Sequence, residues 1–192
     1  MLIITVLSCK AQSIIVPIGS GQHFEKTSNY YKKDVNNEFE KFTGEWTYQN
    51  STTEITFKLK KEEHYQTSSD SNYMDLLVGE YQYIESGIEK INTLSEFNNS
   101  SISGYQHKIS GRVFVHQLPQ NCIDNSNIQE IKIELSIRNP TNRFIEGRII
   151  LRYINDNGIE KLEACISDYT TLSDNADDKF DIPDGYYVFT KQ

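Results

Sequence analysis

Apolar and polar residues alternate along most of the chain beyond residue 44. The clearest stretch is 130–139, in which Ile131, Ile133, Leu135 and Ile137 are separated by charged or polar residues. This period of two is typical of a strand that buries one face and exposes the other. Strands are predicted on the same grounds at 44–48, 54–60, 74–84, 88–93, 101–105, 111–118, 145–154, 159–166 and 186–191.

Turn signals separate these stretches. The sequences ESG at 85–87 and NDNG at 155–158 are typical of tight hairpins between antiparallel strands. The chain shows no regular alternation of strands and helices, so the pattern predicts an all-β, antiparallel, up-and-down meander of about eight to ten strands. Such a sheet removes its edges by closing into a lipocalin-like barrel or by folding as a two-layer sandwich, and both alternatives are open.

One segment has a different period. Apolar residues recur at near-helical spacing between charged residues over 30–42, which predicts one short N-terminal amphipathic helix. Gly44 then ends it, because glycine adopts the conformation in which a chain leaves a helix. Residues 13–29 show no clear period and are interpreted as a linker or tether. Residues 30–192 are therefore expected to form a single β domain.

The first twelve residues, MLIITVLSCKAQ, are apolar as far as Leu7 and then become small and polar. An apolar run before a small-residue processing site is typical of a secretory signal, so segment 1–12 predicts export to the periplasm, outer membrane or cell surface. Two processing sites fit: acylation of Cys9, as in a bacterial lipoprotein, or ordinary cleavage after Ala11. A buried N-terminal strand is the remaining alternative.

The net charge limits the classes of binding partner, and the cysteine content bears on the cellular compartment. The net charge is −8, which argues against nucleic acid and against general attraction to anionic lipid, so membrane contact is expected only through a lipid anchor. If Cys9 carries lipid, Cys122 and Cys165 form an even pair in an oxidising compartment and could be joined by a disulfide. Two buried thiols are the alternative. No oligomeric state is indicated.

Motifs for catalysis, cofactors or metals are weak. No Ser-His-Asp order, glycine-rich phosphate loop or metalloprotease motif is present, so we expect no enzyme, no catalytic residue and no cofactor. His107, His116 and Cys122 could meet as zinc ligands, but nothing enforces their spacing. The acidic loop lacks a full calcium-binding series and is interpreted as solvated, with no metal. Its carboxylates are Asp174, Asp177, Asp178, Asp181 and Asp184.

Tyrosine is abundant, with 12 residues. Tyr81 and Tyr83 share one face of a predicted strand, and Tyr48 lies beside Trp46 in sequence. These rings combine apolar area with a hydroxyl, so they could line a ligand cavity or a saccharide-binding face. Alternatively, they fill the inside of a sheet that contains little leucine.

The order of a helix, Gly44-x-Trp46 at the start of the first strand, and a meander resembles the lipocalin-like barrels. In that superfamily the tryptophan plugs the closed end of the barrel and packs under a basic residue from a late strand. The resemblance implies a structural plug formed by Gly44 and Trp46, with Arg152 and Lys191 as the candidate basic partners.

A second resemblance covers nearly the whole chain. The start ending in SCKAQ, FTGEWTYQN followed by FKLKK, DLLVGEYQYIESGIEKINTL, and the terminal IPDGYYVFTKQ are together similar to an uncharacterised family of exported proteins from Bacteroidetes, a domain of unknown function. This resemblance implies export and no particular chemistry.

The leading hypothesis is an exported, lipid-anchored, non-catalytic β-barrel-like domain that binds a small, partly apolar ligand through Tyr48, Tyr81 and Tyr83. The barrel interior would have to contain a cavity for this to hold, because a barrel of about eight strands can be filled with side chains or can hold one small ligand. The alternative is a cell-envelope module that presents its sheet or loops to a protein or a glycan.

Overall fold

The computed structural model describes residues 13–21, 29–67, 72–119, 122, 126–127, 129–168 and 179–192. These residues form one large sheet with three single turns of 3-10 helix. The strands are β1 (Ile14–Pro17), β2 (Tyr30–Lys33), β3 (Gly44–Gln49), β4 (Thr53–Gln66), β5 (Tyr73–Glu85), β6 (Ile88–Asn92), β7 (Ile109–Val115), β8 (Lys132–Arg138), β9 (Glu146–Asp156), β10 (Ile159–Asp168) and β11 (Gly185–Lys191).

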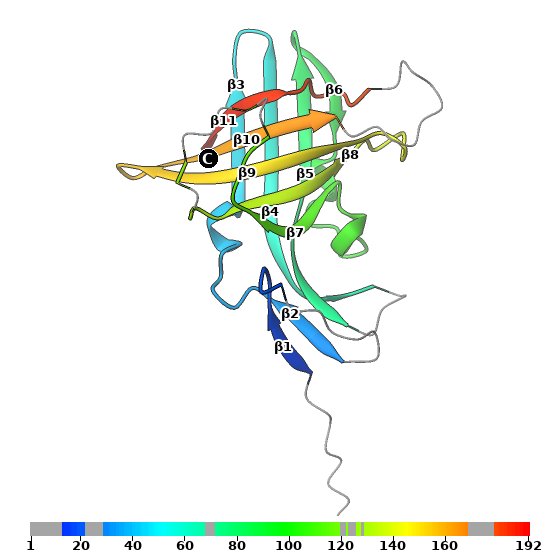
Figure 1. The fold of residues 1–192 in the computed structure, drawn as a ribbon. Helices are drawn as coiled ribbons and strands as arrows, with labels where there is room; N and C mark the ends of the chain where they lie inside the picture. The colour runs from blue at the N-terminus through cyan, green and yellow to red at the C-terminus, as the bar shows by residue number, and fades with distance from the viewer. Residues whose placement is uncertain are drawn as a thin grey trace, which may run out of the picture.

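Eight strands close into an antiparallel up-and-down barrel in the order β3-β4-β5-β7-β8-β9-β10-β11. The last barrel strand, β11, pairs with the first, β3, where Lys191 lies opposite Trp46. β5 pairs with β7, where Val78 lies opposite Ser110, and this pairing completes the barrel. Figure 1 shows β8 to β11 crossing over β3, β4 and β5 as the sheet wraps around. The all-β meander is confirmed, and the barrel is the correct alternative.

Among the boundaries that differ from the predicted ones, the largest departures are in β4 and at 101–105. β4 continues to Gln66, six residues beyond the predicted end of this strand at residue 60, with a bulge between Glu62 and Tyr65. The short strand expected at 101–105 is absent, because η3 (Gly104–Gln106) forms a single turn there. Ser103 and Gln106 close that turn with a reciprocal capping box.

The N-terminal helix expected over 30–42 is wrong. Tyr30–Lys33 form strand β2, and only η1 (Glu40–Phe42) has one turn of 3-10 helix. The Asp34 carboxylate accepts hydrogen bonds from the backbone N–H groups of residues 38 and 39, at 2.8 and 2.9 Å. Aspartate favours such local turns over a helix. The near-helical spacing of apolar residues instead reflects a turn that buries Phe39 and Phe42 against the barrel.

The linker expected over 13–29 also contains a strand. β1 pairs in parallel with β2, and β2 pairs in parallel with the start of β5. Both lie below the barrel, beside the extended end of the β4–β5 hairpin (Figure 1). The buried Asp75 carboxylate fixes this corner, because it accepts hydrogen bonds from the Tyr31 hydroxyl and from the backbone N–H of Asp34. The linker interpretation therefore fails for residues 14–17.

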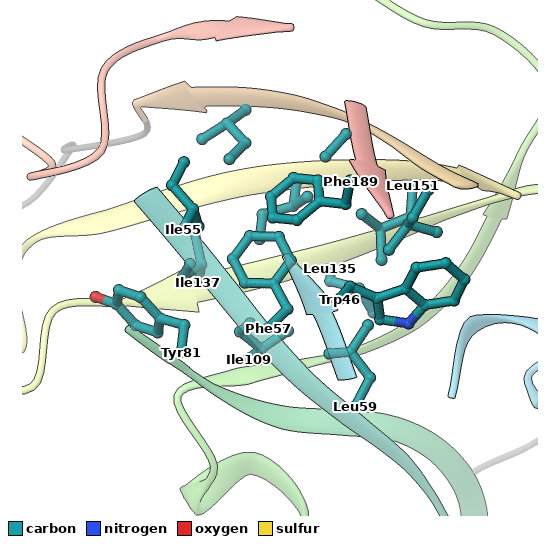
Figure 2. Close-up of a cluster of buried hydrophobic side chains, with 14 of the residues drawn as sticks. Trp46, Ile55, Phe57, Leu59, Tyr81, Ile109, Leu135, Ile137, Leu151 and Phe189 are labelled. Atoms are coloured by element: carbon teal, nitrogen blue, oxygen red, sulfur yellow. The ribbon is translucent and has the colours of Figure 1, made fainter. Parts of the chain in front are cut away.

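Apolar side chains fill the inside of the barrel. The Phe57 and Phe189 rings stack with their centres 4.6 Å apart, and Figure 2 shows these rings among the aliphatic side chains of β4, β8 and β9. Trp46, Tyr81 and Leu151 are fully buried in the same cluster. Inward residues from all eight barrel strands contribute to this core, which explains the period of two along the chain.

Candidate functional site

The tyrosines proposed as ligand contacts belong to the core. Tyr81 is fully buried, and its hydroxyl donates to the Arg138 carbonyl at 3.2 Å. Tyr83 is 2% exposed, and its hydroxyl donates to the Glu85 carboxylate. Tyr48 is partly buried and packs edge-on against Tyr187, with ring centres 5.0 Å apart. The structure therefore uses these rings to fill the barrel, and neither of the two described cavities lies inside it.

Burial also changes the acidity of these tyrosines. Removal from water disfavours the charged phenolate and raises the pKa of Tyr83 and of Tyr187 to about 12. The same cause raises the pKa of Tyr81 further. These hydroxyls therefore keep their protons to a higher pH than tyrosine in water does.

Gly44 and Trp46, for which the lipocalin-like resemblance predicts a structural plug, lie at the start of β3. The Trp46 ring is fully buried, and its indole N–H donates to the Phe42 carbonyl at 2.9 Å. The Lys191 ammonium lies 5.3 Å from the centre of the ring. Gly44 has a φ of +119°, and a Cβ there would meet the Lys191 side chain at 3.1 Å. Of the two candidate basic partners, Lys191 is therefore the one that contacts Trp46.

A disulfide joins Cys122, in the β7–β8 connection, to Cys165 on the outer face of β10. Their Cα atoms are 5.9 Å apart. Ile150 and parts of Val115, Leu118 and Tyr186 cover the bond. The connection is thereby held against the outside of the barrel.

The candidate metal ligands do not converge in the described part of the chain. No group of three or more His, Cys, Asp or Glu side chains there is arranged to hold a metal. His107 is fully buried against Glu80, with 2.9 Å between Nδ1 and Oε1. Cys9, His23, Asp174, Asp177 and Asp178 lie outside the described residues. No described helix has the length and apolar character needed to cross a bilayer.

The largest described cavity is an open groove of about 390 Å³ on the outer wall of the barrel. We call it the outer groove. It crosses β7, β8 and β9, and η3 contributes Tyr105 at one side. Its polar side chains come from outward positions of the three strands. They are Ser110, Arg112, Glu134, Ser136, Glu146 and Arg148.

Strand register explains why these side chains meet. Ser136 pairs with Ser110 on one side and with Arg148 on the other, so the three side chains form one row across the wall. A bulge between Ser110 and Val113 places one extra residue on β7. Bulges re-aim side chains, and Arg112 lines both the outer groove and the smaller cavity beside the turn after β1. A Cβ on Gly111 would lie 2.7 Å from the Glu134 carbonyl, so the bulge requires glycine.

The charges in the outer groove are poorly paired. The closest ion pair is Arg148 with Glu134, at 4.0 Å. Among the described residues, Arg112 and Glu146 have no hydrogen-bond or ion-pair partner, and the buried atoms Arg112 Nε, Arg148 Nε and Ser136 Oγ have none either. Buried polar atoms are normally satisfied by protein, water or a bound molecule. Three of the six such orphan atoms described therefore belong to residues that line one cavity.

Arg152, four residues beyond Arg148 along β9, is paired differently. Its guanidinium donates to both Glu130 oxygens, at 2.9 and 3.1 Å, and to Glu163 at 2.9 Å. The hydrogen bond to Glu130 is the main reason that its pKa is raised. Arg152 thus ties Glu130, near the end of the β7–β8 connection, to the wall, whereas the one partner described for the outer-groove arginines is the 4.0 Å contact between Arg148 and Glu134.

A family model matches residues 1–192. The chain belongs to DUF6705, a family of unknown function. A search of curated proteins and a search of solved structures gave no match. The family assignment therefore supports the whole-chain resemblance in its general form, and the function has to be argued from the outer groove.

Sequence reasoning missed the outer groove because its residues are ordinary polar members of alternating strands. The one local signal is Gly111 within an apolar and polar run on β7, because an isolated glycine in a strand often marks a bulge. The convergence of Ser110, Ser136 and Arg148 depends on the register of three strands, which the sequence does not specify by itself.

Proposed function

We propose that this DUF6705 chain is an exported, non-catalytic binding domain of the cell envelope that holds its ligand in the outer groove. The observation that carries this proposal is the cluster of unpaired polar groups there, in a cavity of about 390 Å³. Binding sites are usually concave, with a few convergent polar groups and a size of about 300–1,000 Å³. The small-ligand hypothesis is kept, but its site moves from the filled barrel to the outer wall.

Two features support export. The first twelve residues have the pattern of a processed signal, with Cys9 as the candidate for a lipid anchor. The bond between Cys122 and Cys165 is typical of an oxidising compartment. If Cys9 is acylated, replacing it with serine releases the protein from the membrane fraction. An unchanged membrane fraction after that replacement would contradict acylation.

The arrangement of the two groove carboxylates supports a binding role over hydrolysis. Glu146 pairs with Arg138, four residues along β8 from Glu134, so their backbones lie roughly 13 Å apart along the strand direction. Hydrolytic pairs on sugars hold their two carboxyl groups about 5–9.5 Å apart, so this backbone spacing gives such a pair only if both glutamate side chains lean toward each other. The row formed by Ser110, Ser136 and Arg148 lies between the two glutamates. This position favours a role for each glutamate as a separate ligand contact.

The test is native mass spectrometry of residues 13–192 purified from a bacterial periplasm and exposed to envelope extracts. We expect a reproducible added mass that denaturation releases. The variant Arg112→Gln/Arg148→Gln should lose this mass. The matched control is Arg143→Gln, which changes charge at an exposed arginine outside the outer groove. A bare polypeptide mass with every extract, or an added mass that survives in the groove variant, would contradict the proposal.

A further inference from the structure

We infer that the ligand of the outer groove is a neutral saccharide, held by hydrogen bonds to the groove arginines and glutamates with one sugar face on Tyr105. This inference rests on the proposed function, because it names the chemical class of ligand for the same site. It is drawn from the charge balance, the spacing of the polar groups and the flanking apolar surface.

The charges of the outer groove argue for a neutral ligand. Two arginines and two glutamates line it, so their formal charges cancel. A ligand with a net charge would be attracted by one pair and repelled by the other. The long Arg148–Glu134 contact also leaves most donors and acceptors of these four groups unused. The ligand must therefore accept from guanidinium groups and donate to carboxylates within a small volume.

Hydroxyl groups meet this requirement. Each one both donates and accepts, and adjacent sugar hydroxyls can use an arginine and a glutamate together. Hydrogen bonds to charged groups are stronger than those between neutral groups. The row of Ser110, Ser136 and Arg148 crosses three strands. Since strands are about 4.8 Å apart, the row presents polar groups over roughly 10 Å, a span that suits more than one sugar ring.

Apolar surface flanks the polar row. Tyr105 is 37% exposed and Val113 is 54% exposed, and both line the outer groove. Tyr105 is held in place, because its ring packs edge-on against Tyr65 with centres 5.6 Å apart and its hydroxyl contacts the Met74 sulfur at 3.6 Å. A fixed, partly exposed ring gives an apolar platform at little entropic cost, which fits the C–H face of a sugar.

An extended peptide fits this surface less well. Peptides that bind sheets usually add a strand at an edge, where backbone groups are unpaired. β7, β8 and β9 are paired with one another, and their barrel is closed. Where Ser110, Ser136 and Arg148 cross the wall, each described strand is paired with its neighbour, so this part of the outer groove offers side chains rather than a backbone ladder, and a peptide there would lose the main source of its affinity.

The experiment presents three immobilised panels to the full domain: neutral oligosaccharides, acidic oligosaccharides and peptides. The variants are Arg112→Gln, Arg148→Gln and Tyr105→Ala, with Arg143→Gln as the matched control. Because the two groove arginines make no hydrogen bond to other described residues, their variants should retain the wild-type melting temperature. A binder from the panel is then titrated in solution by calorimetry.

We expect binding to neutral oligosaccharides, weakened at least about tenfold by each arginine variant, as the loss of a charge-assisted hydrogen bond requires. Tyr105→Ala should lose binding, and Arg143→Gln should retain it. Groove-dependent binding to peptides or to acidic sugars alone would overturn the saccharide inference and leave the proposed function standing. Binding that is unchanged in every groove variant, or the absence of groove-dependent binding to any panel, would overturn both the saccharide inference and the proposed function.

Discussion

Trp46 is the side chain whose replacement tests the barrel core most sharply. It is the only tryptophan, is fully buried, donates its indole N–H to the Phe42 carbonyl and lies under Lys191. Trp46→Ala removes the ring and leaves a cavity. Trp46→Phe retains most of the apolar area and removes only the hydrogen bond and part of the contact with Lys191.

The magnitudes follow from these contacts. Replacing a buried tryptophan with alanine costs about 3–5 kcal/mol of the free energy of unfolding. Leaving the buried carbonyl without its donor costs about 1–3 kcal/mol, so Trp46→Phe should lie near that range. A domain of this size loses roughly 2–4 °C of melting temperature per kcal/mol. We therefore expect a loss of about 10 °C for alanine and clearly less for phenylalanine.

The assay is urea unfolding followed by far-ultraviolet circular dichroism, since the variants lack the tryptophan fluorescence of the wild type. Lys191→Met is the companion variant, and it should cost about 1 kcal/mol through the lost cation–π contact and the exposed ion pair with Glu160. A loss below about 1 kcal/mol for Trp46→Ala would refute the plug, because it would mean that the ring bears little of the packing.

Three further outcomes follow from the core and the walls. Reducing the Cys122–Cys165 bond opens a loop of 43 residues in the unfolded chain. On the loop-entropy model this lowers the free energy of unfolding by about 4 kcal/mol, and equal urea midpoints with and without reductant would contradict it. The folded state holds the protons of Tyr83 and Tyr187 up to a pKa of about 12, against about 10 in an unfolded chain. Stability from this source is therefore present below pH 10 and is lost as the pH rises towards 12; titration of all 12 tyrosines near pH 10 without loss of dichroism would count against it. Gly111→Ala should lower the melting temperature, because its Cβ meets a backbone oxygen of β8 at 2.7 Å; an unchanged melting temperature would mean that the bulge tolerates a side chain.

Strand identity and hairpin turns could be predicted from the sequence because their causes are local. β8 lies within the stretch whose alternation is cleanest, and its odd-numbered residues face the core. The turn at Asn157 and Gly158 has positive φ at both residues, as a tight hairpin requires. These features depend on a few neighbouring residues, so a periodic pattern and turn composition are sufficient.

The helix predicted over 30–42 was wrong because the spacing of apolar residues carries no information about hydrogen bonds between a side chain and the backbone. The Asp34 carboxylate binds the N–H groups of residues 38 and 39 and fixes a turn. Contacts between strands that are distant in sequence could not be predicted either. Lys191 and Trp46 are in register only because β11 returns to β3, and the sequence offered Arg152 as an equal candidate.

The outer groove was unpredictable for the same reason. Polar residues at its positions look like any solvent-exposed strand face, and only the register of β7, β8 and β9 brings them together. What distinguishes Arg112 and Arg148 from Arg152 is the absence of close partners among the described residues, a property of the assembled wall and not of the local sequence.

The most direct test of the outer groove is nuclear magnetic resonance of the arginine Nε–H groups in a 15N-labelled domain, assigned by the Arg112→Gln, Arg148→Gln and Arg152→Gln variants. On titration with a ligand recovered from envelope extracts, the signals of Arg112 and Arg148 should shift together and saturate. The signal of Arg152, which is held by Glu130 and Glu163, should stay in place. Shifts confined to core residues such as Trp46, with the groove arginines unmoved, would contradict the account and return the ligand to the barrel interior.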